Sequence, residues 1–218
     1  MSIEETFKKR FQARKFLEDK IPDKELIKSL LEKTFKLVPS KQSLVPYKVW
    51  VLGPEHLETK QKLHELSSWH WKKNKPERTH YATIQLLAPY LLIFTDREVD
   101  DVSPAILENI EKGHPYSILK LGNSQEAKTL EMGMFSKILT GLCLEEGLAV
   151  SYTLCFPRHY GRVEKHHQKY VLGDLPEIMA IIESHVLLLM SIGYPDGENF
   201  VKKNNEYKPP MENIIKWI

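Results

Sequence analysis

Two arginines near the start of the chain, Arg10 and Arg14, are the clearest candidates for binding an anion. They stand four residues apart, and two guanidinium groups at that spacing can hold a phosphate through bidentate, charge-assisted hydrogen bonds. The spacing alone favours a plainer interpretation, because a run of charged residues is more often a solvated surface. Other parts of the sequence must decide between these interpretations.

The sequence gives little support to nucleophilic or metal-dependent catalysis. Neither Cys143 nor Cys155 has an obvious histidine partner in sequence, and no Gly-x-Ser-x-Gly motif is present. None of the nine histidines forms the i,i+4 pair that places two metal ligands on one helix face, so we expect no metal site. The ten glycines contain no Gly-x-Gly-x-x-Gly motif, which argues against a Rossmann-type cofactor site and a P-loop.

Composition narrows the class of protein further. Lys and Arg total 31 against 29 Asp and Glu, and a formal charge of +2 predicts no nucleic-acid partner. Two cysteines are too few for a disulfide framework, so we expect a reducing, cytoplasmic location. The longest apolar stretch, 186–190, is far shorter than the ~20 residues of a membrane span, and the N-terminus, which is helical in character, has no signal-peptide core.

The apolar spacing predicts the elements that would position the candidate residues. In the first half of the chain we expect an amphipathic helix at 23–37, a proline-bracketed loop at 39–46, a strand at 47–52, a helix at 54–69, a basic loop at 72–80 and a buried strand at 89–95. The stretch 96–122 has no regular pattern and is predicted to be a variable insertion.

The strongest predicted element is a helix at 124–146, in which apolar residues form one continuous stripe. Asn123 and Glu126 resemble a capping box, and Gly147 stands where a C-cap glycine is expected. Gly133 and Gly141 are either glycines that the helix merely tolerates, or they face a closely packed neighbouring helix. The predicted elements that complete a single α+β domain spanning 1–218 are strands at 148–156 and 186–193, a basic helix at 157–170 and a polar tail at 196–210.

Several motifs occur in the order that a known family shows. The segment 10–16 reads Arg-Phe-Gln-Ala-Arg-Lys-Phe, and 39–47 reads Pro-Ser-Lys-Gln-Ser-Leu-Val-Pro-Tyr. These resemble the Arg-Arg/His-Ser-x-Arg/Lys-x-Phe opening and the Pro-Ser-Ser-x-Asn-x-Gln-Pro-Trp loop of the FMN-dependent nitroreductase family. Later landmarks in the same order are Ala88-Pro89, Glu146-Gly147-Leu148, Gly193-Tyr194-Pro195 and Lys208-Pro209-Pro210.

The resemblance implies a nitroreductase-like fold, with a central, mostly antiparallel mixed sheet flanked by helices. It implies an obligate homodimer in which the helix at 124–146 lies in the interface and a C-terminal arm extends onto the partner. Two FMN molecules would lie in that interface, each contacted by both subunits. The implied activity is an NAD(P)H-dependent, ping-pong reduction of nitroaromatics, quinones or other electron-poor small molecules, with hydride transfer at flavin N5 and no catalytic side chain.

The resemblance also implies which residues contact FMN. Arg10 and Lys208 would hold the phosphate and Arg14 would reach the pyrimidine edge, while Phe11 and Gln12 replace the family's polar residue and Ser. The other implied positions are Pro39, Ser40, Lys41 and Ser43 of the partner's loop, Thr153, Leu154 and Cys155 beside flavin N5, and Thr83 or Gln85 over the pyrimidine.

Departures from the family pattern fall mainly in the loop, where Lys41, Ser43, Val45 and Tyr47 replace a small residue, Asn, Gln and Trp. The phosphate cations remain, so we expect FMN binding to survive and the choice of substrate to differ. One alternative is the same fold with other flavin chemistry, either dehalogenation or flavin degradation. The other is a nucleic-acid-binding module using the basic stretches 69–75 and 158–169, against which the near-neutral charge argues.

Overall fold

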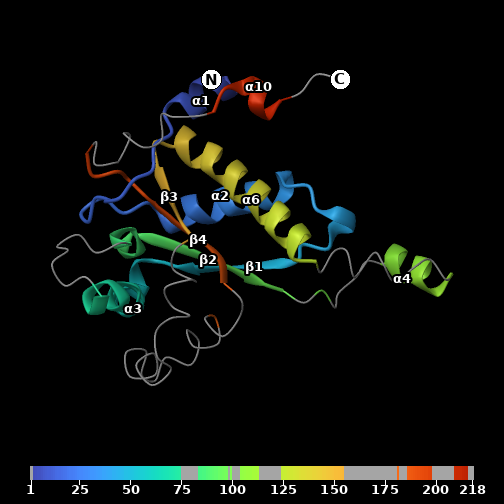
Figure 1. Cartoon of the computed structure of the whole chain (residues 1–218), viewed down its shortest axis with the longest axis horizontal. Coiled ribbons are helices and arrows are strands. Elements are labelled where there is room, and N and C mark those ends of the chain that lie inside the picture. The colour runs from blue at the N-terminus through green and yellow to red at the C-terminus, as the bar shows by residue number, and fades with distance from the viewer. Residues whose placement is uncertain are drawn as a thin grey trace.

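Four antiparallel strands form the central sheet of the computed structural model, which describes residues 2–74, 83–97, 99, 104–112, 124–154, 181, 186–197 and 209–215 (Figure 1). The strands are β1 (Tyr47–Leu52), β2 (Tyr90–Asp96), β3 (Ala149–Thr153) and β4 (Val186–Gly193), and their order across the sheet is β1-β2-β4-β3. A single parallel bridge joins Gln12 to Val150, so the described sheet is mostly antiparallel, as predicted.

Two long helices, α2 (Lys24–Leu37) and α6 (Gln125–Glu145), cover one face of this sheet (Figure 1). Side chains along a strand alternate between faces, so Leu92 and Phe94 of β2 point toward these helices. There Phe94 packs edge-on against Phe135 of α6, with 5.8 Å between the ring centroids. This buried layer fixes α6 on the sheet over most of its length.

The helix α3 (Leu57–Asn74) covers the opposite face, where Leu63 and Leu66 pack against Leu91 and Ile93 of β2. Lys60 of the same helix is almost fully buried, and its Nζ donates hydrogen bonds to the carbonyl oxygens of the two residues that precede β2, at 2.7 and 2.9 Å. Burial lowers the pKa of Lys60 to about 8. This lysine therefore joins α3 to the start of the central strand.

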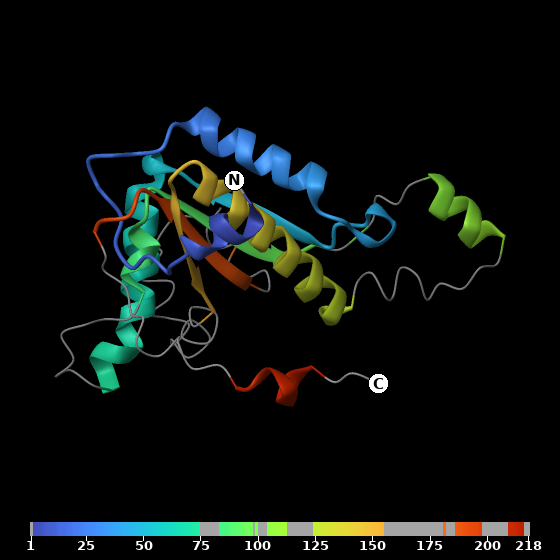
Figure 2. The same ribbon diagram turned by 90° about the horizontal axis from the view of Figure 1, so that it is seen from above.

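The smaller described elements lie at the ends and edges of this three-layer arrangement. They are the helices α1 (Ile3–Lys8), α4 (Pro104–Glu111) and α10 (Met211–Ile214), and the 3₁₀ helices η1 (Lys41–Ser43), η2 (Pro54–His56) and η3 (Ile84–Leu87). In Figure 2 α10 stands apart from the sheet and its covering helices. No helix in the described ranges has both the length and the apolar character needed to cross a membrane.

Two glycines allow the chain to turn or to pack closely next to this sheet. Gly147 ends α6 with φ +73°, the left-handed conformation expected of a C-cap glycine. At Gly193 a Cβ would lie 2.8 Å from Phe16 Cδ1 and 2.9 Å from Pro89 Cδ, which is too close for any larger residue. Gly193 therefore lets the N-terminal segment pack against the end of β4.

Several predicted boundaries were wrong, although the strands and main helices were in place. The helix predicted at 54–69 begins with η2 and continues as α3 to Asn74, so it includes the start of the predicted basic loop. The predicted insertion 96–122 contains α4. The N-cap of α6 is Ser124 rather than Asn123, because the Ser124 hydroxyl accepts the hydrogen bond from the backbone N–H of Ala127. The strand predicted at 148–156 ends at Thr153, and the predicted helix 157–170 lies outside the described residues.

Candidate functional site

The N-terminus was predicted to be helical in character, but its second part, the segment 10–16, is not helical and pairs with strand edges instead. Helix α1 ends at Lys8. The backbone N–H of Ala13 then donates to the carbonyl oxygen of Val150 in β3 at 3.3 Å, and Phe16 forms a bridge with Pro195 just beyond β4. This pairing covers the outer edge of β3, which would otherwise expose unpaired backbone groups.

Arg10 and Arg14 both project from this segment as exposed cations. Among the residues that the structure describes, neither guanidinium has an acidic partner, whereas Lys8 nearby pairs with Glu4 at 2.7 Å. Arg10 lies close to Tyr152 of β3: burial raises the pKa of Tyr152, and the charge of Arg10 partly opposes that rise. The two arginines thus present unpaired positive charge beside β3.

Gln12 and Phe11 have structural contacts of their own between these arginines. The Gln12 Nε2 donates to the carbonyl oxygen of Tyr152 at 3.2 Å, across 140 residues of sequence. The Tyr152 hydroxyl donates to the carbonyl oxygen of Ser136 at 3.1 Å and contacts the Thr140 hydroxyl, both on α6. Phe11 packs against a small apolar cluster that includes Ala13 and Phe16 of the same segment. It was predicted to contact the cofactor, and this packing contact was not predicted.

Gln85 brings a polar side chain to the end of β3. It is 6% exposed, and its Nε2 donates to Thr153 Oγ1 at 3.1 Å. Its Oε1 is buried and has no hydrogen-bond partner among the described residues. Thr83, the other candidate for this position, is buried against Ser67 instead, whereas Leu154 beyond β3 is 63% exposed. The structure therefore places Gln85, rather than Thr83, next to the predicted flavin segment.

An unpartnered buried acceptor is uncommon in proteins and calls for an explanation. A flavin pyrimidine ring carries an N–H donor, and the buried Gln85 Oε1 would be the complementary acceptor if the side chain turned toward that ring. The guanidinium groups of Arg10 and Arg14, which have no acidic partner in the described part of the chain, are likewise complementary to a phosphate and to an electron-rich ring edge. The residues present on this side of the predicted site therefore fit FMN.

The loop at 39–46 supplies the second set of predicted residues, and its backbone is unusual. Ser43 and Val45 have positive φ angles of 59° and 43°. The Ser40 hydroxyl accepts a hydrogen bond from the backbone N–H of Val45 at 2.8 Å, and η1 forms the turn between them. Pro39, Lys41 and Ser43 are exposed. The loop therefore presents three of the predicted cofactor-lining residues on its outside, whereas Ser40 is half-buried and its hydroxyl is bonded to Val45.

The two sets of predicted residues lie toward opposite ends of α6 in one chain. Phe7 of α1 packs against Gly141, whereas the backbone N–H of Lys41 donates to Oε1 of Glu131 at 3.0 Å. Gly141 comes ten positions after Glu131 in the helix, which corresponds to about 15 Å along the axis. Figures 1 and 2 show the same arrangement, with α1 and the 39–46 loop near different ends of α6. One chain does not bring these two sets together.

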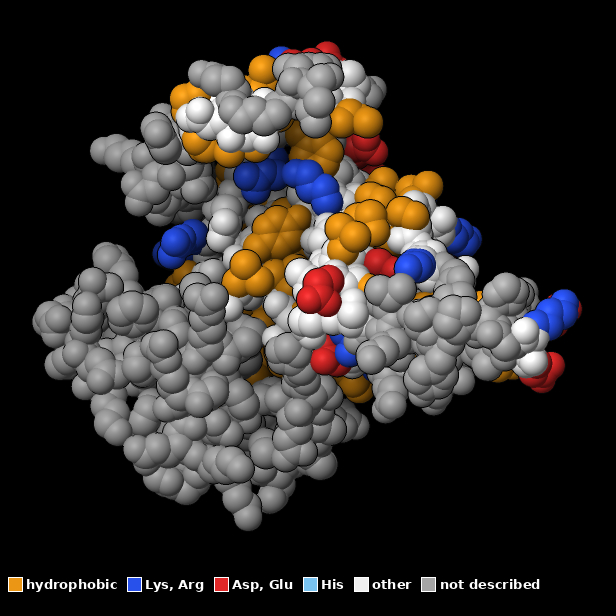
Figure 3. Space-filling view, turned by 45° about the vertical axis from the view of Figure 1, so that its right-hand side comes forward, with side chains coloured by type: hydrophobic (Ala, Val, Ile, Leu, Met, Phe, Trp, Pro, Cys, Tyr) orange, Lys and Arg blue, Asp and Glu red, His pale blue; other side chains and the backbone are white. Residues whose placement is uncertain are grey.

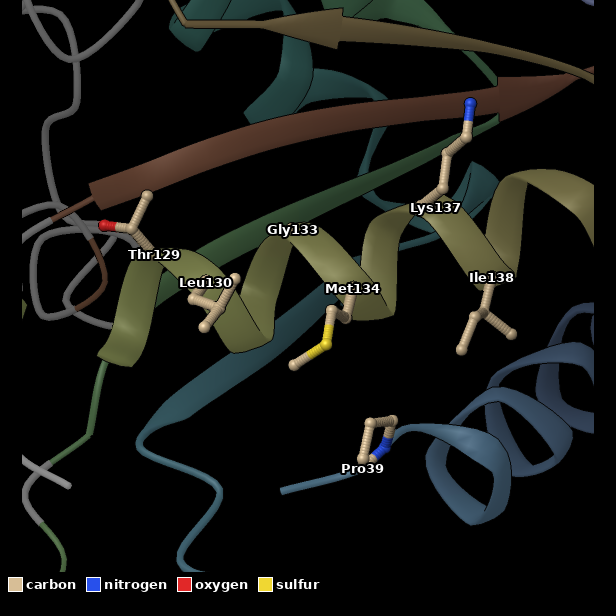
Figure 4. Close-up of a pocket in the computed structure, with 7 residues that line it drawn as sticks. All are labelled: Pro39, Thr129, Leu130, Gly133, Met134, Lys137 and Ile138. Carbon is tan, nitrogen blue, oxygen red and sulfur yellow. The ribbon is translucent and has the colours of Figure 1, made fainter. Parts of the chain in front are cut away.

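An apolar groove of about 480 Å³ runs along the outer side of α6. Figure 4 shows that Leu130, Met134 and Ile138 project from α6 on the side of Pro39, with Gly133 between them. A Cβ added at Gly133 would meet no atom within 4 Å, so the backbone of α6 is open there to close approach. On the face drawn in Figure 3, exposed apolar side chains lie next to Lys and Arg side chains.

A second, more polar hollow of about 370 Å³ opens beside Arg14. Ile84 and Leu87 of η3 contribute apolar walls, whereas Asp19 and Asp196 contribute acidic ones. This mixture gives it no excess of positive charge. Within the described ranges no group of three or more His, Cys, Asp or Glu side chains could hold a metal ion.

Two predicted positions, Cys155 and Lys208, lie outside the described residues. Three residues near the predicted site were not predicted from the sequence: Tyr152, Glu131 and Arg97. Glu131 could have been noticed in the sequence, because it is a lone acidic residue one turn from Phe135 on the buried stripe of α6.

Cys143 on the same helix faces the core, where burial raises the pKa of its thiol to about 12. This cysteine is therefore an unreactive thiol.

Solved structures share the fold of this chain along its whole length. One from Exiguobacterium sibiricum 255-15, described as a nitroreductase in complex with FMN, has a TM-score of 0.65 and 16% identity, and the match covers 100% of this chain and 98% of that one. One from Staphylococcus epidermidis ATCC 12228, described as an NAD(P)H:FMN oxidoreductase, has a TM-score of 0.63 and 12% identity, with 100% and 96% covered. A BluB-like flavoprotein from Clostridium difficile 630 has a TM-score of 0.61 and 18% identity, with 100% and 99% covered.

The chain therefore has the fold of nitroreductase-like flavoproteins, which confirms the predicted fold class. At these identities the likeness concerns the fold alone. No family model matches the chain, and no curated protein sequence gives a significant match.

Proposed function

We propose that the chain folds as one FMN-binding domain spanning 1–218 and acts as an NAD(P)H-dependent FMN oxidoreductase in a homodimer. The observation that carries this proposal is the group of unsatisfied polar side chains beside β3. Arg10 and Arg14 have no acidic partner within the described ranges, and the buried Oε1 of Gln85 has no donor there. On a nitroreductase-like fold, these groups complement the phosphate and the pyrimidine ring of FMN.

Each residue of this group has a separate role in the proposal. Arg10 donates charge-assisted hydrogen bonds to the phosphate, and Lys208, which lies outside the described residues, is assigned to the same group. Arg14 places a cation at the pyrimidine edge, where it favours negative charge on the ring system. Gln85 accepts from the pyrimidine N–H through Oε1 after FMN binding moves its side chain and makes this buried atom accessible. Gln12 aligns the 10–16 segment by its bond to the Tyr152 carbonyl.

The separation of the two sets of predicted residues supports a homodimer. In a two-fold dimer the same surface meets itself, so an antiparallel pair of α6 helices places one end of each helix beside the other end of its copy. The partner's Pro39, Ser40, Lys41 and Ser43 then approach the Arg10 side of the site. The apolar groove with Leu130, Met134 and Ile138 would be the surface through which the two α6 helices pack.

The exposed C-terminal residues are explained by the same dimer. Met211, Ile214 and Ile215 are exposed apolar side chains in and next to α10. In the proposal they form part of an arm that packs on the partner subunit. Burial of such side chains in an interface is favourable because it removes apolar surface from water.

When bound, FMN supplies the redox chemistry, since it can take two electrons from NAD(P)H and pass them to a nitroaromatic, a quinone or another electron-poor small molecule in a separate half-reaction. The protein's residues bind and orient the cofactor and set the charge around the ring. No described side chain has to act as a nucleophile in this scheme.

Turnover assays of the FMN-loaded protein test the proposed activity. With NADH or NADPH as donor and a nitroaromatic or a quinone as acceptor, we expect oxidation of the nicotinamide that depends on the acceptor. Initial rates at several fixed acceptor concentrations should give parallel double-reciprocal lines, which indicate a ping-pong mechanism. If FMN-loaded protein consumes neither donor with any of these acceptors, the proposed activity is wrong and other flavin chemistry on the same fold becomes the better hypothesis.

A further inference from the structure

Two side chains from outside the 39–46 loop hold its backbone at opposite ends. Glu131 on α6 is 3% exposed, and its Oε1 accepts a hydrogen bond from the backbone N–H of Lys41 at 3.0 Å. Arg97, which follows β2, donates through Nη1 to the carbonyl oxygens of Leu44 at 2.8 Å and Val45 at 3.0 Å. The loop is thus bonded both to the helix and to the sheet.

The conformation held in this way is one that a free chain seldom adopts. Val45 has φ +43°, and for a β-branched residue a positive φ is a genuine outlier. Ser43 has φ +59° in the same loop. The side chain of Leu44 between them is buried in a small apolar cluster, so the loop cannot relax by turning outward. Such a backbone persists only where its surroundings over-determine it, and these positions are concentrated at functional sites.

The hydrogen bonding of Glu131 shows that its carboxyl group serves the loop. Within the described part of the chain, its Oε1 bonds to the Lys41 N–H and its buried Oε2 has no partner. A carboxyl group kept in the interior for stability would normally have both oxygens satisfied by hydrogen-bond donors. Glu131 is therefore poorly suited to a core position, and its carboxyl group makes a specific hydrogen bond to the loop.

We infer that Glu131 and Arg97 are positioning residues of the cofactor site, which hold the 39–46 loop so that Pro39, Ser40 and Ser43 are already placed for the FMN that the partner subunit binds. The inference rests on the proposed function for the identity of the cofactor. A loop held in its binding conformation before the ligand arrives loses less conformational entropy on binding, and this raises affinity.

The test compares Glu131→Leu with Glu131→Gln, and Glu126→Leu on the exposed first turn of α6 is the matched control. Hydrogen exchange of the Lys41 amide is measured on protein without FMN, and the FMN dissociation constant by quenching of flavin fluorescence. Loss of the hydrogen bond in Glu131→Leu should speed exchange of that amide by about tenfold and raise the dissociation constant by about tenfold. Its unfolding temperature should change by only a few degrees, because leucine removes an incompletely bonded buried carboxyl group but leaves the Lys41 N–H without its acceptor.

The conservative variant separates a positioning role from a merely structural one. The side-chain oxygen of glutamine can still accept from the Lys41 N–H, so Glu131→Gln should match the wild type in both readouts within about a factor of three. The Glu126→Leu control should match it as well. If Glu131→Leu exchanges at the wild-type rate, or binds FMN as tightly as the wild type, the role assigned to Glu131 is wrong.

A second variant carries the test if Glu131→Leu does not fold. Arg97→Met removes the donors to Leu44 and Val45, and a folded variant should bind FMN about tenfold more weakly. Wild-type affinity in that variant overturns the inference. Failure of the proposed function looks different, because wild-type protein would then take up no FMN at all, and the role of the loop in cofactor binding falls with it.

Discussion

Replacing Arg10 with alanine is expected to weaken FMN binding by about 10- to 100-fold, because a hydrogen bond to a charged group contributes about 1.5–3 kcal/mol. Arg10 is exposed beside β3 and has no acidic partner in the described part of the chain, so its removal breaks no ion pair of the protein itself. The fold should therefore be unchanged, and the loss should appear only in affinity. Equilibrium dialysis or flavin fluorescence measures it.

The matched control for this variant is Lys28→Ala, which removes an exposed cation from α2. It changes net charge by the same amount and should leave the FMN dissociation constant within about a factor of two, because Lys28 is not among the predicted FMN contacts and an exposed charge away from the site is screened by salt. The assignment of Arg10 to the phosphate is contradicted if Arg10→Ala retains FMN as well as this control does.

Leu130→Glu is expected to convert the proposed homodimer to monomers and to abolish FMN binding in the same step. Leu130 is 65% exposed in the single chain and lines the groove on α6, so glutamate costs the isolated chain little. In a two-fold dimer it would bury two unpaired carboxylates, each at a cost of several kcal/mol. Sedimentation velocity gives the mass, and FMN titration of the same sample gives the affinity.

The control for this variant is Leu57→Glu on α3, where the leucine is 49% exposed on another part of the surface. It should remain dimeric and bind FMN like the wild type. Two results would count against the account. A Leu130→Glu protein that stays dimeric excludes the α6 groove as the interface, and a monomeric one that binds FMN normally shows that one chain contains the whole site.

The sequence was a good guide wherever one pattern extended over a whole element. The strands β1 and β4 have the predicted bounds 47–52 and 186–193, since continuous apolar or β-branched runs between turn residues leave little choice. Helix α6 was equally clear from its long apolar stripe. The end of the helix shortly before Gly147 was predictable, because a residue that adopts positive φ is needed there.

The failures came where tertiary contacts outweigh local pattern. The 10–16 segment has a charged, helix-like composition but pairs with the edge of β3, which no local signal predicts. Helix α4 is only eight residues long and lies in an irregular stretch, so its apolar spacing was too short to recognise. The full length of α3, which extends beyond the predicted end at residue 69, was predictable in principle. From Leu57 onward the first helix breaker in the sequence is Pro76.

The residues of the candidate site also fall into two groups, those that a local pattern identifies and those that only the folded chain brings together. Resemblance in short motifs was enough to select Arg10, Arg14 and the 39–46 loop. The bond from Gln85 to Thr153 and the bond from Lys41 to Glu131 span 68 and 90 residues, and such pairings exist only once the chain has folded. Residues that position a site through contacts of this kind require the structure.

Whether the chain is a dimeric FMN protein can be read from the visible absorbance of purified wild-type protein after incubation with excess FMN and gel filtration, together with the mass of the coloured species. We expect a yellow dimer with one FMN for each subunit. A colourless protein that cannot be reconstituted with FMN would contradict this expectation.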